Sequence, residues 1–328
     1  MERESSASVD VRGAAERLRG VVRRTPLSPF PSPDPRIDLR LKLESEQETG
    51  SFKARGAWNQ IAQLGPGERA AGVVTTSSGN HGRALAWAAR RAGVRATICM
   101  PANVYPNKIR ACREEGAEVV LAPTRPAAEA ECARRVESGA VLVHPYAAAR
   151  TAAGAGTVGL EVAEDWPAVE VVLVPVGGGG LIGGAAKALA EALGDEVAVI
   201  GVEPSGAPNL TRALAERRVV VIDPITTAVQ GLCPLAVGEI NLALAERYVE
   251  GTISLSDPEI FAGQRHLVRA GQVVEPAGAA AFAAVLAGAL PAELLAGRDA
   301  RRPLRVCCVV SGGNADPDQL ARLREGGA

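Results

Sequence analysis

The stretch Val171-Val-Leu-Val-Pro-Val-Gly-Gly-Gly-Gly180-Leu-Ile-Gly-Gly184 decides how this chain folds. The strongly apolar run over residues 169–176 predicts a buried strand, and the run over 181–193 predicts a helix. Four consecutive glycines join the two. Backbone N–H groups in such a loop can approach an anion, and the start of the following helix adds a favourable field. The stretch therefore predicts an α/β protein with a phosphate site in its glycine loop.

The glycine loop taken alone has two interpretations. Gly178-x-Gly180-x-x-Gly183 matches the dinucleotide-binding fingerprint, and Glu203 follows the next predicted strand, where a ribose-binding acid is expected. A site for an isolated phosphate group is the other interpretation. An ATP-type loop is excluded because no Gly-Lys-Ser/Thr follows the glycines.

The rest of the chain alternates between short apolar runs and alanine-rich helical segments. Strands are expected at residues 39–43, 72–76, 97–100, 118–121, 140–143, 169–176, 197–202 and 304–310. Helices are expected at residues 51–64, 83–92, 107–115, 127–138, 156–163, 181–193, 258–270 and 277–287. This alternation predicts parallel-rich, twisted sheets with helices on both faces.

Two domains account for this order of elements. Residues 71–149 form a small α/β unit of their own, whereas the later series needs the early strand and helix to complete its sheet. We therefore predict a large domain from residues 1–70 and 150–328, with the small domain inserted into it. A ligand site is expected in the cleft between them, beyond the carboxyl ends of the strands.

Composition excludes several classes of protein. The formal net charge is -1, with 22% charged residues, which predicts neither nucleic-acid nor membrane binding. No apolar run could span a bilayer, and the N-terminus has no secretory signal. The six cysteines form no Cys-x-x-Cys pair, which fits a reducing cytoplasm. The fourteen residues after Asn314 leave no room for a regulatory domain.

Lys53 lies in the run Glu46-Gln-Glu-Thr-Gly-Ser-Phe-Lys-Ala-Arg-Gly-Ala57, among small and apolar neighbours. Burial disfavours the charged amine and lowers its pKa, and a neutral lysine is a nucleophile toward carbonyl groups. The alternative is a lysine whose stem packs while its ammonium group reaches water.

Two further polar loops follow predicted strands. Ser77-Ser-Gly-Asn-His-Gly82 offers hydroxyls, an amide and free N–H groups, and Ser311-Gly-Gly-Asn314 offers a hydroxyl. Each loop taken alone is also an ordinary turn with a helix cap.

Taken together, these motifs resemble the fold-type II pyridoxal-phosphate enzymes (the tryptophan synthase β-like fold), in the branch of threonine/serine dehydratases and serine racemases. The matching segments span nearly the whole chain, and they are Ser51-Phe-Lys-Ala-Arg-Gly-Ala57, Ser77-Ser-Gly-Asn-His-Gly82, Pro175-Val-Gly-Gly-Gly-Gly-Leu181, Val202-Glu-Pro204, Val274-Glu-Pro-Ala-Gly278 and Ser311-Gly-Gly-Asn314. A dinucleotide-binding protein, the alternative from a different class, explains one loop and gives Lys53 no role.

The resemblance implies a role for each of these motifs. Lys53 would hold pyridoxal 5'-phosphate covalently, Phe52 would flank its ring, and Asn80 would bind the ring hydroxyl. Ser311 would face the pyridine nitrogen. The phosphate would lie on the amides of Gly177, Gly178, Gly179, Gly180 and Leu181. The substrate carboxylate would be bound by the loop of Ser77, Ser78, Gly79, Asn80 and His81.

The resemblance also implies the reaction. The substrate would be a small amino acid, L-threonine, L-serine or a related β-hydroxy amino acid, converted by loss of water to a 2-oxo acid and ammonia. Lys53 would be the base at Cα. Ser78 leaves serine racemase open as an alternative, because in racemases a serine at this position acts on the opposite face of Cα. Hydroxyaspartate dehydratase is a further alternative. The family resemblance suggests a homodimer.

Several residues depart from the family pattern. Arg83 and Ala155 stand where glutamine is common, and Gln230 stands where aspartate is common, so the preferred substrate stays open. Glu203 and Ala207 resemble the family's cation site, which would suit a monovalent or divalent cation. A glutamate that caps a helix is the equal alternative.

Overall fold

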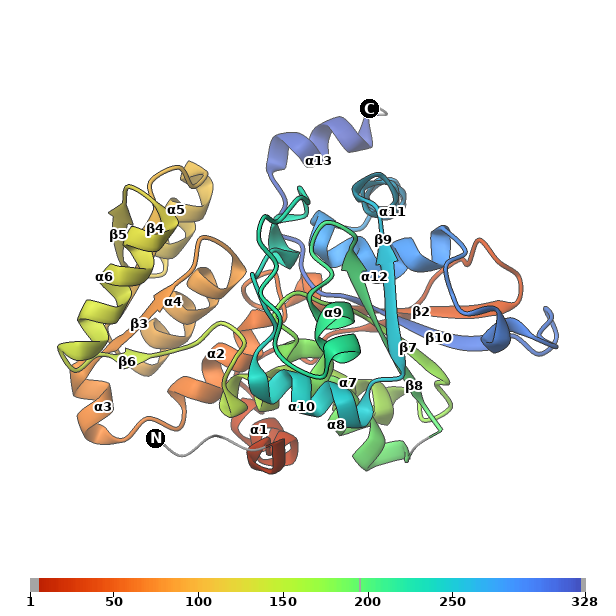
Figure 1. The fold of residues 1–328 in the computed structure, drawn as a ribbon, viewed down its shortest axis with the longest axis horizontal. Helices are drawn as coiled ribbons and strands as arrows, with labels where there is room; N and C mark the ends of the chain where they lie inside the picture. The colour runs from red at the N-terminus through yellow and green to blue at the C-terminus, as the bar shows by residue number, and fades with distance from the viewer. Residues whose placement is uncertain (1–5, 195, 326–328) are drawn as a thin grey trace.

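The computed structural model describes residues 6–194 and 196–325. It contains a six-stranded sheet, in the order β1-β2-β10-β7-β8-β9, and a four-stranded sheet, in the order β5-β4-β3-β6. In Figure 1 the smaller sheet lies with α4, α5 and α6 at the left, and the larger sheet lies at the centre and right. The predicted fold class is confirmed. Residues 1–5, 195 and 326–328, which the predicted large domain includes, lie outside the described residues.

The strands are β1 (Leu27–Pro29), β2 (Ile37–Leu43), β3 (Val73–Thr76), β4 (Ala96–Pro101), β5 (Glu118–Ala122), β6 (Val141–Leu142), β7 (Val171–Pro175), β8 (Ala198–Pro204), β9 (Gly251–Leu255) and β10 (Leu304–Val310). The α-helices are α1 (Val11–Leu18), α2 (Lys53–Ile61), α3 (Pro66–Ala71), α4 (Asn80–Ala92), α5 (Pro106–Glu114), α6 (Arg125–Glu137), α7 (Ala149–Asp165), α8 (Gly180–Leu193), α9 (Asn209–Glu216), α10 (Glu239–Tyr248), α11 (Asp257–Arg269), α12 (Pro276–Leu286) and α13 (Pro317–Arg324). Short 3-10 turns lie at Ser6–Ser8, Glu44–Glu46, Gln230–Leu232 and Ala292–Leu295.

All strand pairs except β1 with β2 are parallel. The central strand β10 pairs with β2 on one side, where Val306 faces Leu39, and with β7 on the other, where Val306 faces Val171. Every residue of β7 is buried, as expected for a parallel strand covered by helices on both faces. The apolar runs that predicted β7 and β10 therefore form the centre of the larger sheet.

Helix α7 begins at Ala149, whereas its glycine-rich sequence predicted a helix only from residue 156, so that boundary was wrong. Glycine disfavours an isolated helix, but here it permits close packing. A Cβ atom on Gly156 would lie 2.7 Å from the backbone oxygen of Gly184 in α8, and one on Gly154 would lie 2.6 Å from the oxygen of Arg55 in α2. Tertiary contact thus overrides helix propensity in α7.

Helix α2 packs against both parts of the molecule. Ala57 and Ile61 share a buried cluster with Trp87 of α4, while Gly56 lies against Thr151 of α7. The first residue of α2, Lys53, consequently lies where the two sheets' helices meet. The helix predicted over residues 51–64 ends at Ile61, and Pro66 begins a further short helix, α3, since proline fits the first helical position.

A buried group of charged side chains fixes α2 to its neighbours. Arg55 pairs with Glu44 at 2.7 Å and with Glu161 of α7 at 2.6 Å, and Lys42 of β2 pairs with Glu161 at 2.5 Å. The positive charges of Arg55 and Lys42 are thus matched by the negative charges of Glu44 and Glu161. Loss of any one would leave an uncompensated buried charge, which typically costs about 3–5 kcal/mol.

None of the helices within residues 6–194 and 196–325 combines the length and apolar character needed to cross a bilayer.

Candidate active site

Lys53 begins α2 with its amine inside the protein. Its Nζ atom donates a hydrogen bond to the carbonyl oxygen of Pro145 at 2.8 Å and lies 4.8 Å from the centre of the Phe52 ring. Burial lowers the pKa of Lys53 to about 8. At pH 7 roughly a tenth of this amine is therefore neutral, far more than for an exposed lysine, and the neutral form is the one that acts as a nucleophile or a base.

The segment after β6 connects Lys53 to the glycine loop. Nδ1 of His144 accepts hydrogen bonds from the backbone of Ala147 at 2.8 Å and Tyr146 at 3.3 Å. This turn presents the oxygen of Pro145 to Lys53. The Tyr146 ring covers Gly178 so closely that a Cβ atom there would lie 2.2 Å from the ring. The sequence prediction missed this segment, although its place at the end of a predicted strand was the available signal.

The glycine loop suits a phosphate group. Gly179 has a φ of 83°, in the left-handed region that favours glycine, and α8 begins at Gly180. The first backbone N–H groups of a helix have no acceptor within the helix and are free for an anion. Asn241 fixes the loop by donating to the oxygens of Gly178 at 2.7 Å and Tyr146 at 3.1 Å. These contacts fit the predicted phosphate role of residues 177–181, and Asn241 was not predicted.

In the loop after β3, the Ser77 side chain bonds to the loop's own backbone, whereas the Ser78 side chain is exposed. Helix α4 begins at Asn80, earlier than the predicted residue 83, and Gly79 is its N-cap residue. The Ser77 hydroxyl accepts hydrogen bonds from the N–H groups of Gly82 at 3.1 Å and Gly79 at 3.3 Å. The backbone at Gly79 and Asn80 lies at the N-terminus of α4, a suitable place for a carboxylate.

His81 uses its side chain within the core. It is buried, and its Nε2 atom lies 3.0 Å from the oxygen of Val143, to which the neutral ring donates. Burial, followed by the nearby Lys53 charge, lowers the pKa of His81 to about 3. The ring is therefore neutral, and the backbone of His81 is the part suited to a substrate carboxylate.

The loop after β10 lies beside the start of α2. The Phe52 N–H donates to the Ser311 oxygen at 3.1 Å, and Ser51 pairs with Gly312 as an isolated β-bridge. The buried Ser311 hydroxyl lies 3.5 Å from the oxygen of Ala277 at the start of α12. Lys53, Phe52 and Ser311 thus occupy one region, although their motifs lie at opposite ends of the sequence.

Asn80 joins this region through residues with no predicted role. Its Nδ2 atom donates to Oε1 of Glu275 at 2.5 Å, and its Oδ1 atom accepts from Asn314 at 2.9 Å. Burial raises the pKa of Glu275. Glu275 lies in the Val274-Glu-Pro-Ala-Gly278 motif, so the motif was the signal that could have identified it.

Glu203 acts as a helix cap. Its Oε1 atom accepts from the Leu210 N–H at 2.7 Å, and Oε2 accepts from the Thr211 N–H at 2.9 Å and hydroxyl at 2.8 Å. The oxygen of Ala207 already accepts from Asn209 at 2.9 Å. No group of three His, Cys, Asp or Glu residues suited to a metal occurs in the described part of the chain. This geometry favours capping over the predicted cation site.

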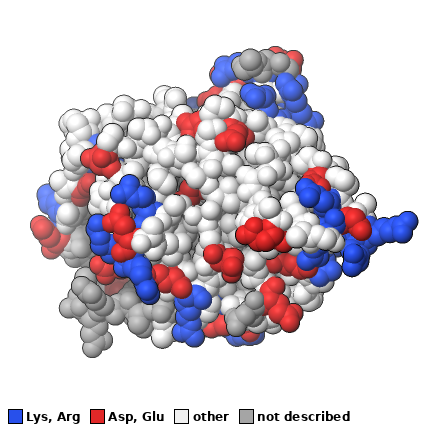
Figure 2. Space-filling model, turned by 45° about the vertical axis from the view of Figure 1, so that its right-hand side comes forward, with Lys and Arg blue, Asp and Glu red and all other residues white. Residues whose placement is uncertain are grey.

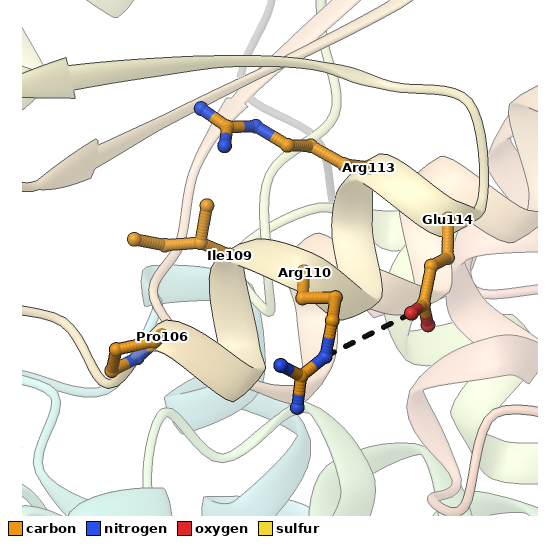
Figure 3. Close-up of a pocket in the computed structure, with 5 residues that line it drawn as sticks. All are labelled: Pro106, Ile109, Arg110, Arg113 and Glu114. Carbon is orange, nitrogen blue, oxygen red and sulfur yellow. Dashed lines mark ion pairs between the residues drawn. The ribbon is translucent and has the colours of Figure 1, made fainter.

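An open pocket of about 520 Å³ lies elsewhere, along one side of α5. Figure 3 shows its lining residues, including Ile109 and Arg113, and the 3.8 Å ion pair between Arg110 and Glu114. No residue predicted for the active site lines this pocket.

Two parallel-rich sheets, a half-buried lysine between their helices and a glycine loop at the N-terminus of a helix together define the fold-type II pyridoxal-phosphate enzymes. The chain belongs to the pyridoxal-phosphate dependent enzyme family, whose model matches residues 18–312. The resemblance stated from sequence is thereby confirmed, and this membership replaces the dinucleotide interpretation of the glycine loop.

Three relatives illustrate the similarity. An L-threonine ammonia-lyase of Thermotoga maritima is 38% identical over 319 residues, which cover 96% of this chain and 77% of that protein. A phenylserine dehydratase of Ralstonia pickettii is 37% identical over 95% of this chain and 94% of its own length. The structure of maize serine racemase matches with a TM-score of 0.87 at 30% identity, covering 99% of this chain and 98% of that one.

Proposed function

We propose that this chain is a pyridoxal-phosphate-dependent lyase that removes water from a β-hydroxy amino acid and releases a 2-oxo acid and ammonia. The observation that carries the proposal is the half-buried Lys53 amine, whose pKa is lowered to about 8 at the junction of the two sheets' helices. The lyases among the chain's relatives support the same reaction type.

The site residues fit the cofactor in their chemistry. Lys53 would hold it covalently, beside the Phe52 ring. Backbone N–H groups of residues 177–181 would bind its phosphate, and Asn80 would bind its ring hydroxyl. The Ser311 hydroxyl would face the pyridine nitrogen.

When bound, the cofactor withdraws electrons from an attached amino acid and so makes its Cα proton more acidic. When the amino group of the substrate replaces Lys53 on the cofactor, the released Lys53 amine would be free to take that proton, since its pKa lies close to neutral pH. Ser311 provides a hydroxyl and not a carboxylate, so it brings no negative charge to stabilise a protonated pyridine. This arrangement favours prompt departure of the β-hydroxyl over storage of charge at Cα.

The substrate carboxylate would bind at the N-terminus of α4. Ser77, Ser78 and the backbone over residues 79–81 supply hydroxyl and N–H groups there. L-threonine, L-serine and related β-hydroxy amino acids are the proposed substrates. Relatives named for threonine and for phenylserine indicate that the side chain accepted differs within this group.

Serine racemase is the second candidate, because the exposed Ser78 hydroxyl could act at the other face of Cα. One reaction mixture distinguishes the two. The holoenzyme is incubated with L-serine or L-threonine, and 2-oxo acid and D-amino acid are followed together. We expect oxo acid to form faster, and faster formation of the D-isomer would reject the lyase. Hydroxyaspartate dehydratase is tested by offering 3-hydroxyaspartate in the same assay.

We further propose a cytoplasmic homodimer that binds no nucleic acid. All six cysteines are free, which suits a reducing compartment. On the face drawn in Figure 2, basic and acidic side chains are interspersed and form no extended basic field of the kind nucleic acids require. Light scattering on a size-exclusion column would test the dimer.

A further inference from the structure

The carboxamide of Asn314 can adopt only one orientation. Its Nδ2 atom donates to the carbonyl oxygen of Thr49 at 2.8 Å, and its Oδ1 atom accepts from the Arg83 guanidinium at 2.9 Å. A carbonyl can only accept and a guanidinium can only donate. If the amide were flipped, its oxygen would face the carbonyl oxygen of Thr49 and its NH₂ group would face the guanidinium of Arg83, and neither pair can form a hydrogen bond.

Asn314 in turn fixes Asn80. Because Nδ2 of Asn314 faces Asn80 at 2.9 Å, the atom of Asn80 that it meets must be the acceptor Oδ1. Nδ2 of Asn80 then faces Glu275, where it donates one of its two N–H groups at 2.5 Å. The carboxamide of Asn80 is held at both ends, and one N–H group is left.

Two glycines make room for this arrangement. A Cβ atom on Gly312 would lie 2.4 Å from Oε1 of Glu275 and 3.2 Å from Nδ2 of Asn80. A Cβ atom on Gly50, whose φ is 71°, would lie 2.4 Å from Oδ1 of Asn314. A side chain at position 312 would thus displace Glu275, and one at position 50 would displace Asn314.

We infer that Glu275 and Asn314 are positioning residues that hold the Asn80 amide so that its remaining N–H group serves the cofactor's ring hydroxyl. This inference rests on the proposed role of Asn80. Neither positioning residue would contact the reacting atoms, and both would act through Asn80.

The test measures the affinity of purified apoproteins for pyridoxal phosphate, titrated by tryptophan fluorescence, so that it does not depend on turnover. In Asn314→Asp an oxygen replaces the donor, and affinity should fall about tenfold, as for loss of one hydrogen bond. Asn59→Asp is the matched control, because Asn59 also accepts from an arginine (Arg17, 2.7 Å) and donates to a backbone oxygen (Arg150, 2.7 Å). It should lose stability but bind within about twofold of the wild type. Equal losses in the two variants would overturn the inference.

Substitutions at position 275 separate orientation from charge. Glu275→Gln keeps an acceptor for Asn80, so affinity should stay within about twofold, whereas Glu275→Leu should lose about tenfold. If Gln is as damaging as Leu, the charge and not the orientation matters, and the inference fails. Thermal melts of the apoproteins establish that each variant is folded.

A double-mutant cycle tests whether the effect passes through Asn80. In an Asn80→Ala background, Asn314→Asp should change affinity by less than about twofold. A full additional loss would overturn the inference. Normal binding by Asn80→Ala alone would remove the role of Asn80 and the inference with it, while leaving the proposed lyase intact. Failure of the wild type to bind the cofactor would reject the proposed function itself.

Discussion

The Nζ atom of Lys53 and the carbonyl oxygen of Pro145 lie 2.8 Å apart, and this pair joins the start of α2 to the turn before α7. The same turn places Tyr146 on Gly178 of the glycine loop. A single short segment thus spans the distance between the proposed nucleophile and the proposed phosphate site.

The half-buried amine of Lys53 predicts that the stability of the apoprotein depends on pH. Burial lowers the pKa of Lys53 from 10.5 to about 8, so between these pH values the unfolded apoprotein holds a proton that the folded one has released. Stability should therefore rise with pH across this window. Lys53→Met should stabilise the apoprotein at pH 7 by about 1–3 kcal/mol, and this gain should shrink toward pH 10.

Denaturant unfolding of both apoproteins at pH 7 and pH 10 measures the effect. Lys187→Met is the control, since Lys187 is paired with Glu191 and should show no such gain. A pH-independent difference between Lys53→Met and wild type would contradict the desolvation of Lys53.

Contact between Tyr146 and the glycine loop predicts that Gly178→Ala is harmful. The new methyl group would collide with the base of the ring and displace either Tyr146 or the loop, at a cost of about 1–3 kcal/mol. Cofactor affinity should fall with stability. Gly67→Ala on α3 has open space and should leave both unchanged. Equal affinity in Gly178→Ala and wild type would argue against this loop as the phosphate site.

Ser78→Ala should leave elimination dominant. In the described residues the Ser78 hydroxyl has no activating partner, and the nearby His81 ring is neutral and engaged with Val143. A serine without an activator is a poor base. The ratio of 2-oxo acid to D-amino acid measured in one mixture should change little. Disappearance of a fast D-isomer in the variant would instead identify Ser78 as a racemase base.

Removal of cations should leave the melting temperature unchanged, because the helix N-terminus of α9 already occupies both oxygens of Glu203. Glu203→Ala should destabilise the protein by about 1–2 kcal/mol through loss of the cap. Thermal melts with and without a chelator, and with potassium or magnesium restored, check this. A cation-dependent rise would support the predicted cation site.

Sequence alone located the motifs whose chemistry is local. The four glycines beside an apolar strand and the context of Lys53 require only neighbouring residues to be interpreted. Asn241 could not be found this way, because it acts on Gly178, a residue 63 positions away in the chain. The motif around Glu275 was visible in the sequence, but its partner Asn80 was not, because the two residues are 195 positions apart. The start of α7 at Ala149 could not be predicted for the same reason. Its glycines are favourable in a helix only because they allow close packing on α2 and α8, which are distant in the sequence.

The position of β10 has a consequence for how the protein is made. This strand follows all other described strands in the chain, yet it lies between β2 and β7 in the larger sheet. A nascent polypeptide that has not reached residue 304 has two unpaired strand edges where its central strand belongs. Exposed edges of this kind promote association between incomplete chains. The larger sheet can therefore be completed only after β10 (Leu304–Val310) has been synthesised, late in the translation of this chain.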